Sequence, residues 1–212
     1  MSRKPSTTSF LRDVKDHQMV ILHDDGVCRN IRFAKPDSFC MHFNVTTWPG
    51  CLCFSGDMGC YVFSRLPDMF NFFRRPAGDK SKLPVNPGYW GEKVQAEDKH
   101  SPVQEFSKSK FRRVINKIMY SSKLSKEARA EVKDQVLDRL DDCNGGHEAK
   151  AAAYHFSSGD FCFQDLWDYD FKEHSDRFLW CCYAVSYAVQ EYDQQKVWAQ
   201  KQTAKAIKLK TR

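Results

Sequence analysis

The first third of the chain contains a set of five cysteines and one histidine whose side chains could bind a metal or act as nucleophiles. If the strands of this region pair as hairpins, most of these side chains point to one face of a sheet. Thiolates and imidazole nitrogens bind zinc and other soft metals, and four of them can close a tetrahedral site. The set is Cys28, Cys40, His42, Cys51, Cys53 and Cys60.

The spacing of these thiols argues against a metal site. Cys51 and Cys53 on one strand would hold their sulfurs about 7 Å apart, because a strand rises about 3.3 Å per residue. Structural zinc sites usually use C-x₂-C turns, and the chain has none. Since cysteine is also a common small buried residue, we expect this face to be buried under the C-terminal helices.

No pattern in the chain is typical of an enzyme or of a cofactor site. A cysteine of this set could lie near a histidine, but no nucleophile elbow or protease motif surrounds it. The glycines of SGDMG, residues 55–59, lack the spacing of phosphate-binding loops. We therefore expect a protein that is not an enzyme and needs no cofactor, with thiol-based catalysis as the alternative.

The thiols would be positioned by an antiparallel β-meander of about five strands in the N-terminal half. Alternation of apolar and polar residues predicts the strands, and Gly, Pro and Asp residues predict the turns between them. Pro67 then opens a short helix, residues 68–75, whose Met and Phe side chains would pack on the aromatic face of the sheet. The expected strands cover residues 19–23, 27–33, 40–47, 51–54 and 60–64.

The C-terminal half, beyond Ser101, is expected to be helical, which makes the fold class α+β. The last helix, from His174 to about Lys205, is apolar nearly all round between residues 178 and 189, so it should lie in the core. We expect a single domain over residues 1–212. Residues 1–8 and 206–212 are expected to be disordered. We also expect a short helix capped by Ser9 and a helical insertion at residues 123–146.

Charge and cysteine usage indicate a cytoplasmic protein whose excess positive charge lies in its tail. The chain has 33 basic and 27 acidic residues, and six of the bases follow Asp193, where no acid occurs, so 27 bases balance 27 acids elsewhere. The adjacent thiols Cys181 and Cys182 suit a reducing compartment. No signal segment or membrane-spanning run is visible.

Two exposed-loop candidates and the arginines near them could bind a partner protein. The turn at Asp57 and Met58 is one candidate, and the glycine-flanked pair Tyr89–Trp90 is the other. Trp90 could be a plug that packs over the sheet or an exposed anchor, and we expect the plug. The full partner-binding set is Asp57, Met58, Arg65, Arg74, Arg75, Tyr89, Trp90 and Lys93.

The basic tail and the mixture of arginine and aromatic residues suggest an alternative function, a nucleic-acid-binding protein or a nuclease-like enzyme, with nucleic acid bound non-specifically by the tail. Lysine and arginine side chains would contact phosphates, and such binding weakens steeply with salt. Nothing in the tail points to a membrane. The tail residues concerned are Lys201, Lys205, Lys208, Lys210 and Arg212.

Several sequence phrases resemble an uncharacterised family of small accessory proteins from bacteriophage and prophage genomes. The phrases are TWPG, SGDMG-x-YVFSR, DMF-x-FFR, NPGYWGEK and FLWCCYA followed by EYD. They cover residues 19–93 and 161–193, about half of the chain, and residues 123–146 have no counterpart. The resemblance implies a protein that binds a host protein stoichiometrically, such as an inhibitor of CRISPR or of another antiviral defence, in the bacterial cytoplasm.

Overall fold

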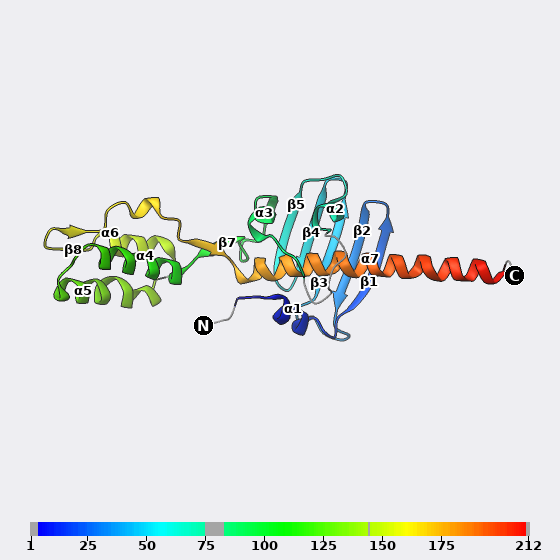
Figure 1. The fold of residues 1–212 in the computed structure, drawn as a ribbon, viewed down its shortest axis with the longest axis horizontal. Coiled ribbons are helices and arrows are strands. Elements are labelled where there is room, and N and C mark those ends of the chain that lie inside the picture. Colours follow the sequence, from blue (N-terminus) through cyan, green and yellow to red (C-terminus); the bar gives the residue numbers. More distant parts are fainter. Residues whose placement is uncertain (1–3, 75–82, 144, 211–212) are drawn as a thin grey trace. The chain divides into compact units, whose positions relative to one another are not determined.

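The computed structural model describes residues 4–74, 83–143 and 145–210, with side chains up to Ala204 (Figure 1). The chain forms two compact units. The first comprises Met1–Val103 and His174–Arg212, and the second comprises Gln104–Glu173. Residues 123–146, expected as a helical insertion, lie inside the second unit.

The first unit is built on a six-stranded antiparallel meander, which confirms the α+β class and the expected meander. Each strand pairs with its sequence neighbour, in the order β1 to β6. Glycine allows the tight turn before β2, where Gly26 has a φ of +58°. The strands are β1 (Gln18–Asp25), β2 (Cys28–Ala34), β3 (Phe43–Trp48), β4 (Cys51–Gly56), β5 (Gly59–Ser64) and β6 (Val94–Glu97).

One long helix, α7 (Asp176–Lys210), covers the aromatic face of this sheet. The ring of Trp180 lies 5.7 Å from that of Phe43, and the ring of Phe178 lies 5.4 Å from that of Tyr61. These contacts confirm the prediction of a buried C-terminal helix. Three short helices complete the same core, namely α1 (Thr7–Asp13), α2 (Met69–Phe73) and α3 (Pro87–Gly91).

The prediction that the C-terminal helices bury the thiol face is wrong. Cys28, Cys51, Cys53 and Cys60 are half-buried, and α7 lies on the opposite face. The reason is that one helix can cover only one face, and the aromatic face offers far more apolar area to remove from water. We call the thiol-bearing surface the outer face of the sheet.

A buried polar network ties α7 and α2 to the sheet. The Arg29 guanidinium donates two hydrogen bonds to the Asp68 carboxylate, at 2.8 and 3.0 Å, and its Nε lies 3.4 Å from the Tyr192 hydroxyl. That hydroxyl donates to Asp24 at 2.8 Å, and Asp24 also pairs with Lys196. Burial lowers the pKa of Arg29, but the bonds to Asp68 and Tyr192 outweigh it and raise the pKa.

The second unit has its own core, formed where two helices face short helical segments. Phe111 and Ile115 on α4 pack with Val132 and Leu140, and all four are fully buried. Its helical elements are α4 (Lys108–Ser121), α5 (Lys126–Val132), a π-helical turn (Lys133–Leu137), two 3₁₀ turns (Asp138–Asp141 and Leu166–Asp168) and α6 (Gly146–Tyr154).

The expectation that everything beyond Ser101 is helical is wrong at four short strands. The pair Ser101–Pro102 resembles the start of a helix, but the chain stays extended there. The helix begins later, at Lys108, and is capped by Ser107. The strands form two separate two-stranded sheets. They are β7 (Gln104–Phe106) with β10 (Lys172–His174), and β8 (Ser157–Ser158) with β9 (Phe161–Cys162).

The chain ends depart from the sequence expectation at both termini. Helix α1 begins at Thr7 and is capped by Ser6 rather than Ser9, because the two serines form a reciprocal capping box. Both terminal helices are thus longer than expected, since α1 begins before Ser9 and α7 runs past Lys205 to Lys210. Within the described ranges, no helix combines the length and apolar character needed to cross a membrane.

Candidate functional site

Strand β1 has one free edge. It pairs with β2 along one side, and no described strand pairs with its other side. The opposite edge of the sheet is the four-residue strand β6, whereas β1 has eight residues. A long free edge presents unpaired N–H and C=O groups to which an extended segment of another chain can add.

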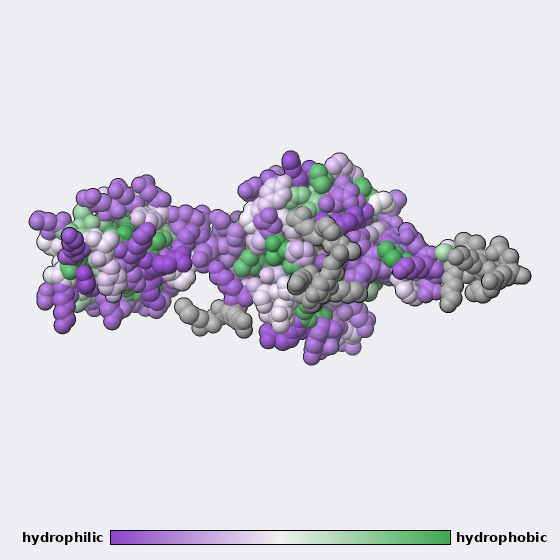
Figure 2. Space-filling model, viewed as in Figure 1, coloured by the Kyte–Doolittle hydropathy of each residue, from purple (hydrophilic) through white to green (hydrophobic). Residues whose placement is uncertain are grey.

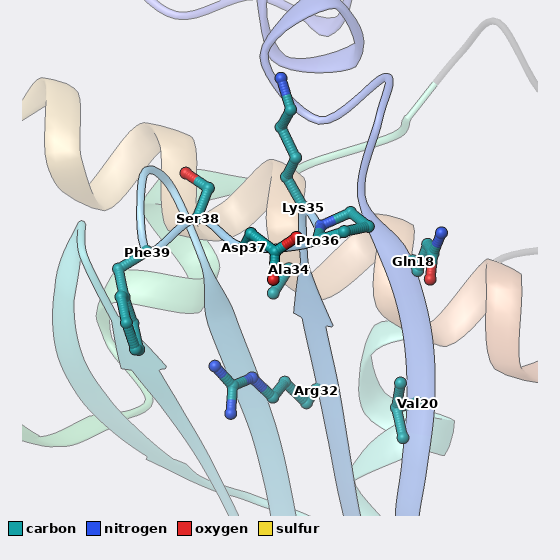
Figure 3. Close-up of a pocket in the computed structure, with 9 residues that line it drawn as sticks. All are labelled: Gln18, Val20, Arg32, Ala34, Lys35, Pro36, Asp37, Ser38 and Phe39. Carbon is teal, nitrogen blue, oxygen red and sulfur yellow. The ribbon is translucent and has the colours of Figure 1, made fainter.

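A hollow of about 570 Å³ lies on the outer face beside this edge (Figure 3). Its apolar walls are Val20 on β1, Ala34 at the end of β2, and Pro36 and Phe39 in the next loop. Val20 is 49% exposed and Phe39 is 76% exposed. The hollow can therefore take an apolar side chain from a partner.

Three charged side chains line the hollow, namely Arg32, Lys35 and Asp37, and the guanidinium of Arg32 extends toward Phe39 in Figure 3. It lies 5.9 Å from the centre of the Phe39 ring. Cation and ring on one wall give a mixed apolar and polar surface, the composition that protein interfaces favour at their centres.

The loop that carries Phe39 is held by hydrogen bonds. The Met41 N–H donates to the Asp57 carboxylate at 2.8 Å, and His42 Nδ1 lies 2.7 Å from the Phe39 carbonyl oxygen. Met41 itself has a φ of +54°, an uncommon conformation for a non-glycine residue. Asp57, expected to contact a partner, thus helps to hold the loop that carries Phe39.

A second groove, of about 330 Å³, lies on the other side of β1. Met19 forms its strand wall, and Glu191, Gln194, Gln195 and Trp198 of α7 form its helix wall. The Trp198 side chain is 63% exposed. A carboxylate and an exposed indole on the same wall suit a long basic side chain, because the cation can pair with the carboxylate or lie over the ring.

The two hollows lie on opposite sides of the same short stretch of β1. Side chains of a strand alternate between the two faces of a sheet, so a segment added to β1 would fill both hollows in turn. The register of β1 with β2 shifts between Ile21 and His23, so Gln18–Ile21 is the bulge-free stretch of β1 beside the hollows. We call β1 with its two hollows the edge site.

The partner-binding residues predicted from sequence fall into two groups. Asp57 and Met58 lie at the turn between β4 and β5. Arg65, Tyr89 and Lys93 lie at the other end of β5, whose six residues span about 17 Å from first to last. The structure therefore does not bring the predicted set together.

The remaining members of that set are engaged inside the first unit or lie outside the described residues. Arg74 donates to the Asp193 carboxylate at 2.7 and 2.8 Å. Trp90 is fully buried, 4.9 Å from the ring of Phe73, and so packs as a plug. Arg75 lies outside the described residues.

The thiols do not converge on one point. Cys53 and Cys60 are nearest, with 3.9 Å between their sulfurs, and burial together with Cys60 raises the pKa of Cys53 to about 12. Cys40 and His42 precede β3 and lie in a loop. In the described part of the chain, no three His, Cys, Asp or Glu side chains are grouped closely enough to hold a metal ion.

Of the tail residues predicted to bind nucleic acid, only Lys201 has a described side chain, and it is exposed. The side chains of Lys205, Lys208 and Lys210 and the whole of Arg212 lie outside the description. Earlier in the helix, Lys196 pairs with Asp24, so the free basic stretch begins after Trp198.

Sequence reasoning missed the edge site. That β1 ends the sheet follows from the order of hairpins, but the hollows need the 35–42 loop and α7 to be placed in space. One local signal was available, since Trp198 is an aromatic residue placed after the apolar part of the last helix.

Comparisons with models of protein families, with curated proteins and with solved structures find no match for this chain. The edge site is therefore interpreted from its own geometry and chemistry.

Proposed function

We propose that this chain is a bacteriophage- or prophage-encoded accessory protein that binds one host protein stoichiometrically. The proposed target is a component of an antiviral defence system, such as CRISPR, in the bacterial cytoplasm. The protein would act by occupying a surface of that target, without catalysis and without a cofactor. The resemblance of several sequence phrases to phage accessory proteins suggests this genomic context.

The observation that carries this proposal is the free edge of β1 between its two hollows. Strand addition obtains affinity from main-chain hydrogen bonds and specificity from pockets for alternate side chains. The edge site offers both features in one place, with Gln18–Ile21 as the pairing stretch.

The chemistry of the hollows specifies the bound segment. Residues facing the outer hollow should be apolar, since Val20 and Phe39 form its walls. Residues facing the inner groove should be lysine or arginine, since Glu191 and Trp198 form its helix wall. The expected segment is extended, unpaired in the free host protein, and alternates apolar with basic side chains.

Affinity purification of the tagged full-length chain from defended cells tests the proposal, with mass spectrometry to identify the partner. We expect one host protein at a 1:1 ratio. Trp198→Ala and Val20→Lys should each weaken its binding about tenfold, the loss expected at an interface hot spot. Tyr154→Ala is the matched control, because Tyr154 is 57% exposed and lies in the second unit.

Melting temperatures separate binding from folding in these variants, since exposed substitutions usually change stability by less than about 0.5 kcal/mol. Failure to recover any host protein, together with unchanged phage growth on defended strains, would contradict the proposed function. Recovery of a partner whose binding ignores Val20 and Trp198 would retain the function and reject the edge site.

A second candidate function is binding of nucleic acid by the tail. The observation in its favour is that α7 continues to Lys210 with no acidic residue after Asp193. Gel shifts with full-length protein should then show complexes at low salt that dissociate as salt rises. Removal of residues 201–212 should abolish them, and persistence of the complexes would exclude the tail.

A further inference from the structure

The second unit contains a basic hollow of about 470 Å³ that the proposed function does not use. Arg112 on α4, Arg129 on α5 and Lys133 at the start of the π-helical turn line it. Met119, Leu137 and Ala130 contribute apolar surface. The hollow is therefore lined by cationic side chains from three segments and by apolar side chains.

The charge of the second unit is divided sharply along its sequence. Residues 104–133 contain nine Lys and Arg against three Asp and Glu, whereas residues 134–173 contain three against ten. A solubilising surface needs no such division. Seven of the nine residues that line the hollow belong to the basic part, and three of them are cations against the single carboxylate of Asp138, so the field of the hollow favours an anion.

The cations of the hollow retain binding capacity. Arg129 Nε is buried and has no hydrogen-bond partner among the described residues. Arg112 donates to the Leu137 carbonyl oxygen at 3.3 Å, and its contact with the exposed Asp141 carboxylate is long, at 3.7 Å. A phosphate oxygen in the hollow could accept charge-assisted hydrogen bonds from the terminal nitrogens of these guanidinium groups.

An aromatic ring adjoins these cations. Tyr120 lines the hollow, is 63% exposed, and has the Arg129 guanidinium 5.3 Å from its ring centre. Exposed aromatic rings beside arginines are the usual platform on which nucleobases stack. Asp138 is the acidic residue of the lining and can accept a hydrogen bond from a ribose hydroxyl or a base amine.

We infer that this hollow binds a nucleotide, with its phosphate on Arg112, Arg129 and Lys133 and its base against Tyr120. The same chemistry is presented by a free nucleotide and by a residue of single-stranded nucleic acid. The site lies wholly in the second unit, so it is independent of the edge site and of the basic tail.

Titrations of the full-length protein at low salt test this inference with three probes. They are ATP without metal, inorganic phosphate, and a single-stranded DNA of about twelve nucleotides, a length within the range such sites cover. We expect ATP or the DNA to bind with a Kd below about 1 mM and at least about tenfold more tightly than phosphate. Tight binding of the DNA with weak binding of ATP would indicate a site for single-stranded nucleic acid. Tight binding of ATP with weak binding of the DNA would indicate a site for a free nucleotide.

Arg129→Gln and Tyr120→Ala should each weaken that binding about tenfold. Arg113→Gln is the matched control, because Arg113 neighbours Arg112 on α4 but is exposed and does not line the hollow. Thermal melts establish that each variant is folded. A loss of binding in these variants cannot come from the basic tail, because they leave residues 194–212 unchanged.

The inference is wrong if neither ATP nor the DNA binds, or if Arg113→Gln weakens binding as much as Arg129→Gln. Equal affinity for phosphate and ATP would show that the base contributes nothing to binding, which would contradict the proposed contact with Tyr120. None of these outcomes depends on a host protein, so they leave the proposed function untouched.

Discussion

Replacing Arg29 by methionine should cost the first unit about 3 kcal/mol of unfolding free energy at pH 7, near the lower end for a broken buried ion pair. The guanidinium is 7% exposed and its partner carboxylate 20% exposed. Methionine fills the volume but leaves Asp68 charged beside α7. The cost stays at the low end because Asp68 retains some water and the hydrogen bond from the Phe70 N–H.

The loss of unfolding free energy caused by Arg29→Met should become smaller at low pH. Burial raises the pKa of Asp68, but the bonds from Arg29 and Phe70 outweigh it, so the folded pKa lies below the unfolded one. A carboxyl with a lowered folded pKa stabilises above its unfolded pKa, near 4, and loses that contribution as pH falls through the folded pKa. The variant lacks the guanidinium, so its disadvantage should narrow below about pH 4.

Urea unfolding followed by tryptophan fluorescence measures this effect, since four of the five tryptophans lie in the first unit. Arg12→Met is the matched control, because Arg12 is 77% exposed and lies 3.9 Å from Asp13. Exposed pairs contribute about 0–1 kcal/mol, so the control should change little. A loss under about 1 kcal/mol at pH 7, or one independent of pH, would refute the network as an anchor.

Three further predictions follow from burial and close contact. Trp90→Ala should cost about 3–5 kcal/mol in urea unfolding, and unchanged stability with lost partner binding would instead make Trp90 an interface residue. Gly56→Ala should cost at least about 2 kcal/mol, because a Cβ there would lie 2.2 Å from the His42 carbonyl oxygen. Gly145→Ala meets nothing within 4 Å and should cost less than about 1 kcal/mol, because alanine is only a poorer N-cap of α6 than glycine. Iodoacetamide should label Cys40 in the native protein but spare the fully buried Cys181 and Cys182, whose pKa burial raises, and native labelling of that pair on mass spectrometry would disprove their burial.

Periodicity predicted the sheet well because alternation directly records which side chains face a core. It failed at β6, whose four residues are mostly exposed, and at Cys40, where alternation continues into a loop ahead of β3. The same alternation correctly grouped Cys51, Cys53 and Cys60 on one face. It could not show what covers that face, since coverage depends on where α7 packs.

The sites were harder to predict than the fold because each needs segments that are distant in sequence. The edge site joins β1 to a loop around Phe39 and to Trp198 on α7. The basic hollow joins Arg112 on α4 to Arg129 on α5 and to Lys133. Burial of Trp90, in contrast, followed from local glycines and nearby aromatic residues.

The position of α7 at the end of the chain has a consequence during synthesis on the ribosome. The aromatic face is complete once β5 ends at Ser64, but its cover arrives only when the chain reaches Tyr192. At about 5–20 residues per second, that face waits roughly 6–25 s, long enough for chaperones to bind it. The seventy-residue second unit, which is made in this interval, therefore delays the closing of the first.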